Sequence, residues 1–198
     1  MTRPDRDEVL SAVEAGIDAV LGALDGADPT AGTSSGSWRV LDLARHLEAI
    51  AGAYLLWTGS AVGGRVARMR VGAELAAYNE LMLHRLPVLP MDAHAQRYRA
   101  LAHDHVRLAR RTWDVPMLQT PDDVVLDVGT HAAVAAVEWH VHTWDLTCGG
   151  PDRHRPDDDV VDVMTTAWDD VLAAVTGIHR DPTGDPWASI LHATGRTP

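Results

Sequence analysis

Glu138 and His142 lie four residues apart in the segment Glu-Trp-His-Val-His, a spacing at which a carboxylate and an imidazole can bind one metal ion. In a helix of about 3.6 residues per turn, both side chains lie on one face, about 6 Å apart along the axis. Val134 and Val141 share that face, which predicts that it points into a core. An ionised glutamate in a core costs several kcal/mol unless it is paired or metal-bound. The spacing therefore predicts a metal site.

His46 is the best candidate for a third ligand, because it falls on the inward side of a helical pattern formed by Leu43, Leu47, Ile50 and Tyr54. Two histidines and one glutamate leave coordination positions open, which is typical of a catalytic rather than a structural metal site. Zinc is the favoured ion, and nickel, iron or manganese suit the same ligands. The alternative interpretation is a core histidine and a glutamate paired with an arginine.

Other histidines compete for the ligand role. His140 is two residues from His142 and points to roughly the opposite face, so a regular helix cannot bring both to one ion. His131 shares the face of the glutamate but lies about 10 Å lower, which favours a place at the surface or behind the ligands. The same two-residue spacing separates His103 and His105.

Short patterns along the chain resemble a known family. The first pattern is Trp38, Asp42-Leu43 and His46-Leu47, and the second is Glu138-x-x-x-His142-x-x-Asp145-Leu146. In this order they resemble the metal-binding domain of mycothiol-dependent maleylpyruvate isomerase, within the wider DinB-like four-helix-bundle group. The closing Thr194-Gly195-Arg196-Thr197-Pro198 is similar to the TGR-x-P ending of one branch of that family.

The resemblance implies an all-α fold, a DinB-like four-helix bundle with a crossover connection and an additional C-terminal helix. It also implies that His46 on the second helix holds the metal together with Glu138 and His142, and that the thiol is mycothiol. The isomerase has a further C-terminal domain that contributes to its active site, whereas the residues after Leu146 read as a helix and a short tail. The resemblance therefore implies the metal site rather than the maleylpyruvate reaction itself.

Apolar residues recur at helical spacing in most of the chain. Helices are expected over residues 5–24, 38–58, 72–86, 91–113, 130–147, 157–176 and 187–193. Residues 117–129 read as a loop with extended character. We expect a metal-binding helical bundle over residues 1–150 and a C-terminal helix and tail over residues 151–198 that pack on the same domain. The long mid-chain connection indicates a crossover between bundle helices.

Composition excludes several classes of protein. The net charge of −11 argues against a nucleic-acid partner, which needs a basic face. The sequence has no apolar run of about 18 residues, so no membrane span is expected, and its charged N-terminus does not resemble a signal peptide. We therefore expect a cytoplasmic protein. The single Cys148 excludes an intrachain disulfide, and its lack of a flanking cation favours no catalytic role.

Two functions fit these observations. The first is a metal-dependent transferase or isomerase that uses a low-molecular-weight thiol such as mycothiol on a small electrophilic substrate. The second is a non-catalytic metal-binding bundle that serves as a stress-related sequestering or interaction protein. A metal-free helical scaffold is a third reading, in which the three ligand positions coincide by chance. We also expect a homodimer, because related bundles often pair helices.

Further side chains are candidates for supporting roles. Asp42 and Asp145 could orient the ligand imidazoles, or they could face solvent or cap helices. An arginine could bind a substrate carboxylate, and the candidates are Arg45, Arg65, Arg68 and Arg70. Four tryptophans near the motifs either pack in the core or form the wall of a substrate pocket: Trp38, Trp57, Trp139 and Trp144.

Overall fold

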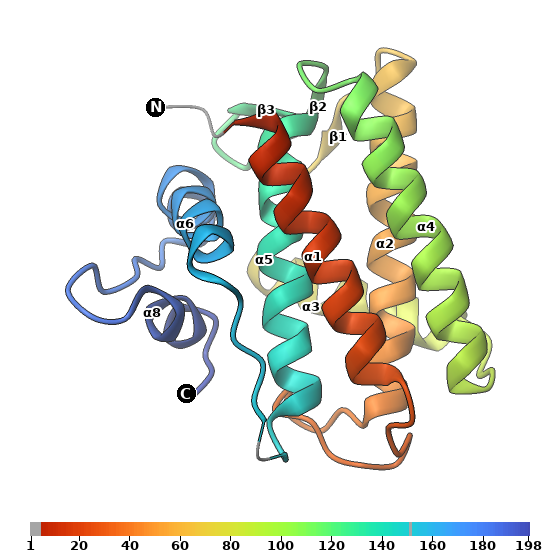
Figure 1. Ribbon diagram of the computed structural model, residues 1–198. Helices are drawn as coiled ribbons and strands as arrows, with labels where there is room; N and C mark the ends of the chain where they lie inside the picture. Colours follow the sequence, from red (N-terminus) through yellow and green to blue (C-terminus); the bar gives the residue numbers. More distant parts are fainter. Residues whose placement is uncertain (1–4, 151) are drawn as a thin grey trace.

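The computed structural model describes residues 5–150 and 152–198, and most of them are helical (Figure 1). Four long helices form a bundle: α1 (Arg6–Leu24), α2 (Val40–Val62), α4 (Met91–Arg111) and α5 (Val128–Thr147). Helix α1 packs along α5, and α2 packs along α4. The predicted all-α, DinB-like bundle is therefore confirmed, with helix boundaries within a few residues of those expected.

Caps and apolar stripes explain where the central helices form. Asp5 begins α1 by accepting hydrogen bonds from the backbone N–H groups of Asp7 at 2.8 Å and Glu8 at 3.3 Å. Asp127 begins α5 in the same way, accepting from the N–H of Thr130 at 2.8 Å. Nearly all of α5 is buried, because the other bundle helices and the C-terminal segment surround it. It is therefore the central helix of the fold.

Gly16 allows α1 and α5 to approach closely. A Cβ atom at this position would lie 2.8 Å from Cβ of Trp139 and 3.2 Å from Nε2 of His140. Real carbon atoms do not approach so closely, so any side chain here would push the two helices apart. The glycine thereby sets the position of the helix that carries Glu138 and His142.

A small sheet connects the crossover segments at one end of the bundle (Figure 1). It contains β1 (Ala67–Arg68), β2 (Pro116–Gln119) and β3 (Val125–Asp127). Strand β2 pairs in parallel with β1 and antiparallel with β3. The extended character expected for residues 117–129 is found in the two strands, whereas the expectation of a loop is corrected there, and residues 128–129 already belong to α5. Strand β2 pairs with β1, about 50 residues earlier, and β3 pairs with β2, so the extended backbone has hydrogen-bond partners.

Helix α3 (Gly72–Arg85) lies outside the bundle, and only Leu83 in it is buried. Arg45 of α2 holds its C-terminal end by donating hydrogen bonds to the carbonyl of Leu83 and, at 3.0 Å, to that of Leu86. Lysine or arginine donors commonly satisfy the last carbonyls of a helix in this way. Arg45 is therefore engaged in fixing α3 beside α2.

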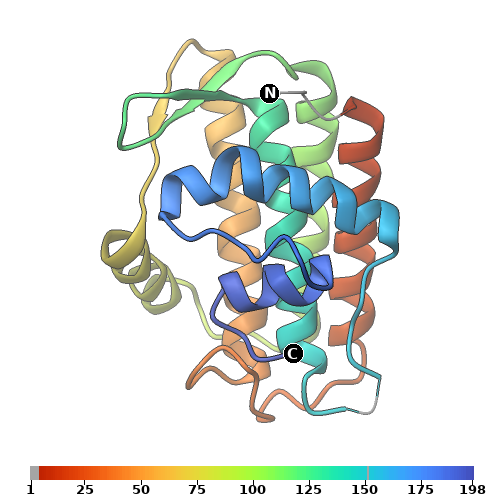
Figure 2. The same cartoon turned by 90° about the vertical axis from the view of Figure 1, so that its left-hand side faces the viewer.

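The C-terminal segment contains α6 (Asp158–Ala167), a π-helical turn η1 (Trp168–Leu172), α7 (Ala173–Thr176) and α8 (Pro186–Ala193). A single helix was predicted over 157–176, and the π-helical turn interrupts it. Helix α6 packs on α5 and α1, and α8 packs on α6. Figure 2 shows both helices, in blue, lying across one face of the bundle.

Two sequence-based expectations fall partly on residues outside the described ranges. Residues 1–4 are part of the charged N-terminus, and Pro151 lies at the expected boundary between bundle and tail. Among the described residues, no helix is long and apolar enough to cross a membrane.

Candidate metal centre

The three predicted ligands come together between α2 and α5. His46 projects from α2, and Glu138 and His142 project from successive turns of α5. One potential ligand atom from each residue lies within 4.8 Å of the other two. Oε2 of Glu138 is 3.3 Å from Nε2 of His142. A single ion placed among these atoms would lie within reach of all three side chains.

The burial of the three side chains differs from the expectation in one respect. His46 and His142 are buried, whereas the side chain of Glu138 is 36% exposed. The glutamate was expected on a face that points into the core, but it opens onto a cavity of about 840 Å³ that all three ligands line. Val134 and Val141, on the same face, are buried and also line the cavity. This arrangement leaves space beside the ligands for a second molecule.

The donor set fits a divalent metal ion. Burial, together with the nearby charge of His142, lowers the pKa of His46 to about 3, so its imidazole is neutral, as a metal ligand must be. Among the described residues, no group hydrogen-bonds to the His46 ring, which lies between the rings of Trp38 and His142 at centroid distances of 4.8 and 5.1 Å. Two imidazole nitrogens and a carboxylate oxygen suit zinc and the neighbouring transition metals.

Electrostatics favour a positive charge between Glu138 and His142. Burial opposes ionisation of Glu138, but the hydrogen bond and charge of His142 outweigh it, and the pKa of Glu138 is lowered. Burial also opposes protonation of His142, yet the hydrogen bonds from this ring to Asp145 and Glu138 raise its pKa. A metal cation would take the place of the proton on His142, because ligation requires the neutral ring.

Asp145 orients the imidazole of His142. Of the roles expected for this aspartate, it is the orienting one, not exposure to solvent or helix capping, that the contacts support. Its Oδ2 lies 2.9 Å from Nδ1 of His142. A carboxylate only accepts, so Nδ1 donates to Asp145, and Nε2, which faces Glu138, is the nitrogen that a metal ion would bind in place of its proton. Asp145 is fully buried and also accepts from Ser34, from Ser35 at 2.6 Å, and from Arg196. Hydrogen bonds of this kind fix the tautomer and orientation of metal-binding histidines.

Asp42 does not orient His46. It accepts from the backbone N–H of Arg39 at 3.1 Å and lies 3.6 Å from Arg45, so it acts at the start of α2. Of the four candidate arginines, Arg70 lines the cavity. Arg45 is engaged with α3, and Arg65 and Arg68 are not among the residues that line the cavity.

The competing histidines lie elsewhere. His140 points away from the ligands, with Nε2 3.1 Å from the carbonyl oxygen of Ala12 and Nδ1 2.9 Å from His154. His131 is buried against Tyr54 rather than at the surface, and it lines the cavity below Glu138. The expected separation of His140 from the ligand face is therefore confirmed, and a surface position for His131 is wrong.

The four tryptophans divide between the two expected roles. Trp38 and Trp57 line the cavity, whereas Trp139 and Trp144 are buried and do not. The indole of Trp139 packs between α5 and its neighbours, 5.3 Å from the ring of Tyr98 and 5.5 Å from that of Tyr54. Cys148 is a free, partly buried cysteine and is not among the residues that line the cavity.

Sequence reasoning missed Arg196, Ser34 and Ser35. The arginine occurs in the quoted TGR-x-P ending, but that pattern alone gave it no role. The serines lie in a loop before α2 that was read only as a Gly/Ser-rich connection. All three donate to the buried carboxylate of Asp145. An aspartate one turn after His142, on a helix expected to face the core, was the signal in the sequence that such partners must exist.

Comparison with known proteins supports the fold. No family model matches the chain, and no curated protein sequence matches it. Among solved structures, the chain is similar to the mycothiol-dependent maleylpyruvate isomerase, with a TM-score of 0.63 and 16% identity over 83% of this chain and 68% of that one. A point mutant of the same isomerase gives a TM-score of 0.64 and 15% identity over the same shares. The likeness at this identity establishes a shared helical-bundle architecture.

Proposed function

We propose that the chain is a divalent-metal-binding protein that acts as a metal- and thiol-dependent transferase or isomerase on a small electrophilic substrate. The observation that carries this proposal is the convergence of His46, Glu138 and His142, within 4.8 Å of one another, at the wall of a cavity of about 840 Å³. A buried structural metal needs no adjoining space of that size, whereas a catalytic one needs room for a second molecule.

Each residue has a defined task in this proposal. His46, Glu138 and His142 would hold the ion, and Asp145 keeps Nε2 of His142 free for it. A bound divalent ion lowers the pKa of a thiol or water and stabilises the resulting anion. A substrate bound against the apolar walls of the cavity would displace water from the ligands, which would strengthen charge interactions there. The chain itself thus supplies the anion-stabilising position and the space for the electrophile.

The isomerase structures support the choice of thiol. They are named as mycothiol-dependent and share the fold, so mycothiol is the thiol that we propose for this chain. Zinc is the metal that we propose first, with nickel, iron or manganese as alternatives that suit the same donor atoms. Trp38, Trp57, Arg70 and Arg196 line the cavity, and such a lining favours an enzyme over a non-catalytic metal-binding bundle.

Zinc binding by three variants tests the ligand assignment. His142→Ala and Glu138→Ala should lose stoichiometric zinc, while His140→Ala should keep it, because position 140 faces His154 and Ala12 instead. Elemental analysis after gel filtration gives the stoichiometry, and circular dichroism shows whether each variant is folded. Full zinc retention by folded His142→Ala would rule out the site.

Cobalt substitution then separates an enzyme from a passive metal-binding protein. If coordination positions are open, a thiol added to the cobalt protein should produce a sulfur-to-cobalt charge-transfer absorption, and Glu138→Ala should abolish it. A cobalt spectrum that no thiol perturbs would favour the non-catalytic bundle.

A further inference from the structure

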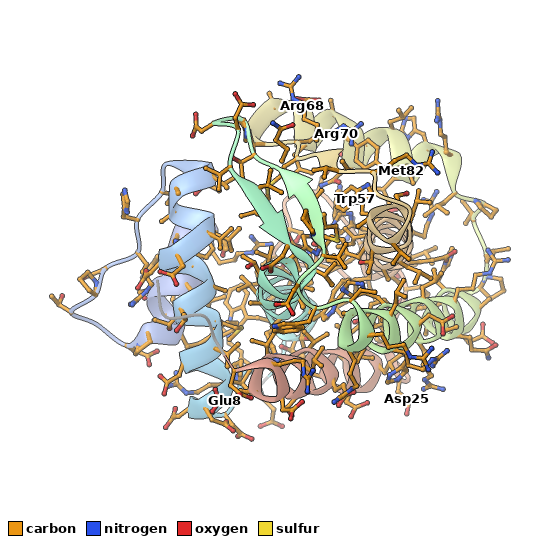
Figure 3. All side chains as sticks on the ribbon, turned by 90° about the horizontal axis from the view of Figure 1, so that it is seen from above. Glu8, Asp25, Trp57, Arg68, Arg70 and Met82 are labelled. Atoms are coloured by element: carbon orange, nitrogen blue, oxygen red, sulfur yellow. The ribbon has the colours of Figure 1, made fainter. Side chains whose placement is uncertain are left out.

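The cavity beside the ligands is walled by apolar side chains from several elements. Helices α2, α3 and α5 and the η1 turn contribute to it, with Ile50, Trp57, Leu75, Met82, Val134 and Leu172 among the lining residues. Figure 3 shows Trp57, Arg70 and Met82 on the side of the bundle opposite to α1, where Glu8 and Asp25 lie. A cavity of about 840 Å³ is within the range of sites that enclose whole small molecules.

Both arginines that line the cavity already have carboxylate partners. Arg196 makes two hydrogen bonds to Asp145, at 3.0 and 2.6 Å. Nε of Arg70 lies 3.6 Å from Oε1 of Glu74, and its guanidinium stands over the ring of Tyr78 at 4.3 Å. The Arg70–Glu74 pair is exposed, at 37% and 58% of the two side chains, so it holds Arg70 only weakly. A substrate carboxylate at Arg196 would have to displace the fully buried Asp145 and leave it without its counter-ion. Burying an anion without such a partner costs several kcal/mol.

Apart from the metal ligands and the two arginines, the lining side chains that could carry a positive charge are two histidines. His131 is buried against the ring of Tyr54, and His192 is exposed. The cavity thus combines one metal-binding end with a large wall that offers an organic molecule mainly apolar contact. Apolar contact contributes roughly 25 cal/mol for each Å² removed from water, so the wall favours a bulky hydrocarbon surface.

From these contacts we infer that the electrophile is an uncharged molecule with an aromatic or aliphatic body, rather than a small dicarboxylate. Its polar, reacting end would lie at His46, Glu138 and His142, and its apolar body would contact Trp57, Met82 and their neighbours. This inference rests on the proposed function, because it assigns the reacting end to the metal ligands.

A series of hydroxamates tests the inference, since the metal-binding group stays constant while the body changes. Isothermal titration calorimetry of zinc-loaded protein should show affinity rising from acetohydroxamate to benzohydroxamate to 2-naphthohydroxamate, by about 10-fold to 100-fold across the series. 4-Carboxybenzohydroxamate should bind at least about 10-fold more weakly than benzohydroxamate. Equal affinity for the smallest and largest members, or tighter binding of the carboxylated one, would overturn the inference.

Adjacent residues of α3 provide a matched pair of variants. Met82 lines the cavity, whereas Leu81 is 44% exposed and does not. Met82→Glu should weaken 2-naphthohydroxamate about 10-fold or more and leave zinc and acetohydroxamate binding unchanged. Leu81→Glu should change none of the three. Equal effects of the two variants would show that the apolar body binds elsewhere.

Arg70→Gln tests whether that arginine is a carboxylate receptor. If Arg70 is satisfied by Glu74 and Tyr78, the substitution leaves the affinity for 4-carboxybenzohydroxamate unchanged. A selective loss of that affinity would contradict the inference.

Failure of the proposed function gives a different pattern, in which the protein takes up no zinc. In that case the fluorescence of 2-naphthol, titrated with the metal-free protein, tests whether the cavity binds an apolar molecule. Saturable binding that Met82→Glu weakens supports the apolar site, and the absence of binding rejects it.

Discussion

Arg196 and Asp145 form an ion pair with two hydrogen bonds directly behind the candidate ligand His142. Nε of Arg196 donates to Oδ1 of Asp145 at 3.0 Å, and Nη2 donates to Oδ2 at 2.6 Å. The same Oδ2 accepts the Nδ1 proton of His142 at 2.9 Å. A residue 51 positions along the chain therefore holds the carboxylate that fixes a ligand imidazole.

Asp145→Asn should weaken zinc binding by about 10-fold to 100-fold, because an amide no longer fixes the proton on Nδ1 of His142. Competition with a chromophoric chelator measures the affinity. Asp42→Asn is the matched control: Asp42 lies one turn before His46 but bonds to the N–H of Arg39, so zinc affinity should not change. Equal losses in the two variants would contradict the role of Asp145.

Arg196→Met should lower the free energy of unfolding by about 3 kcal/mol, since it leaves the fully buried Asp145 without its cation. Arg155→Met removes a similar two-bond pair with Asp185, in which the side chains are 50% and 41% exposed. That loss should stay below about 1 kcal/mol. Denaturant unfolding of metal-free protein gives both values, and similar losses would mean that Arg196 does not stabilise the buried carboxylate.

The convergence of the three candidate ligands could be predicted because its evidence is local. Glu138 and His142 share one helix, so helical geometry alone places them together, and His46 follows from the apolar pattern of a second helix together with the family resemblance. Arg196 could not be placed in the same way. Its partnership with Asp145 depends on how the segment after α8 returns to the bundle, which no local spacing encodes.

The small sheet and the exposure of Glu138 also depended on tertiary structure. Strand β2 has its partner in β1, and a register between segments so far apart cannot be read from either one.

Glu138 was expected in the core because Val134 and Val141 share its face. The C-terminal segment and α3 do not close that face completely, and they leave the cavity into which the glutamate opens.

Gly16→Ala should destabilise the fold by about 1–3 kcal/mol, because the added Cβ would lie 2.8 Å from Cβ of Trp139. Gly22→Ala in the same helix meets no atom within 4 Å and should stabilise by about 0.5–1 kcal/mol through helix propensity. Thermal and denaturant unfolding distinguish these opposite signs. A stabilised Gly16→Ala protein would show that α1 and α5 are not in such close contact.

Burial of His105 makes the fold less stable in acid. Burial lowers the pKa of this histidine to about 4, compared with about 6.5 in the unfolded chain. As the pH falls below 6.5, the unfolded state binds a proton that the folded state does not, so the stability present at neutral pH is lost. Between pH 7.5 and 5, this group alone should lower the free energy of unfolding by about 2 kcal/mol.

His105→Asn removes the titrating ring, so it should flatten the pH dependence of stability by about that amount. Thr58→Val is the control, because Oγ1 of Thr58 lies 3.3 Å from Nδ1 of His105. It removes the hydrogen bond and leaves the histidine, so stability should fall at every pH while the dependence on pH persists. Denaturant unfolding of metal-free protein at both pH values gives the slopes. If His105→Asn keeps the wild-type slope, protonation of His105 does not contribute to acid unfolding. The loss of stability in acid must then come from other buried histidines. His131 is one of them, because burial lowers its pKa to about 3.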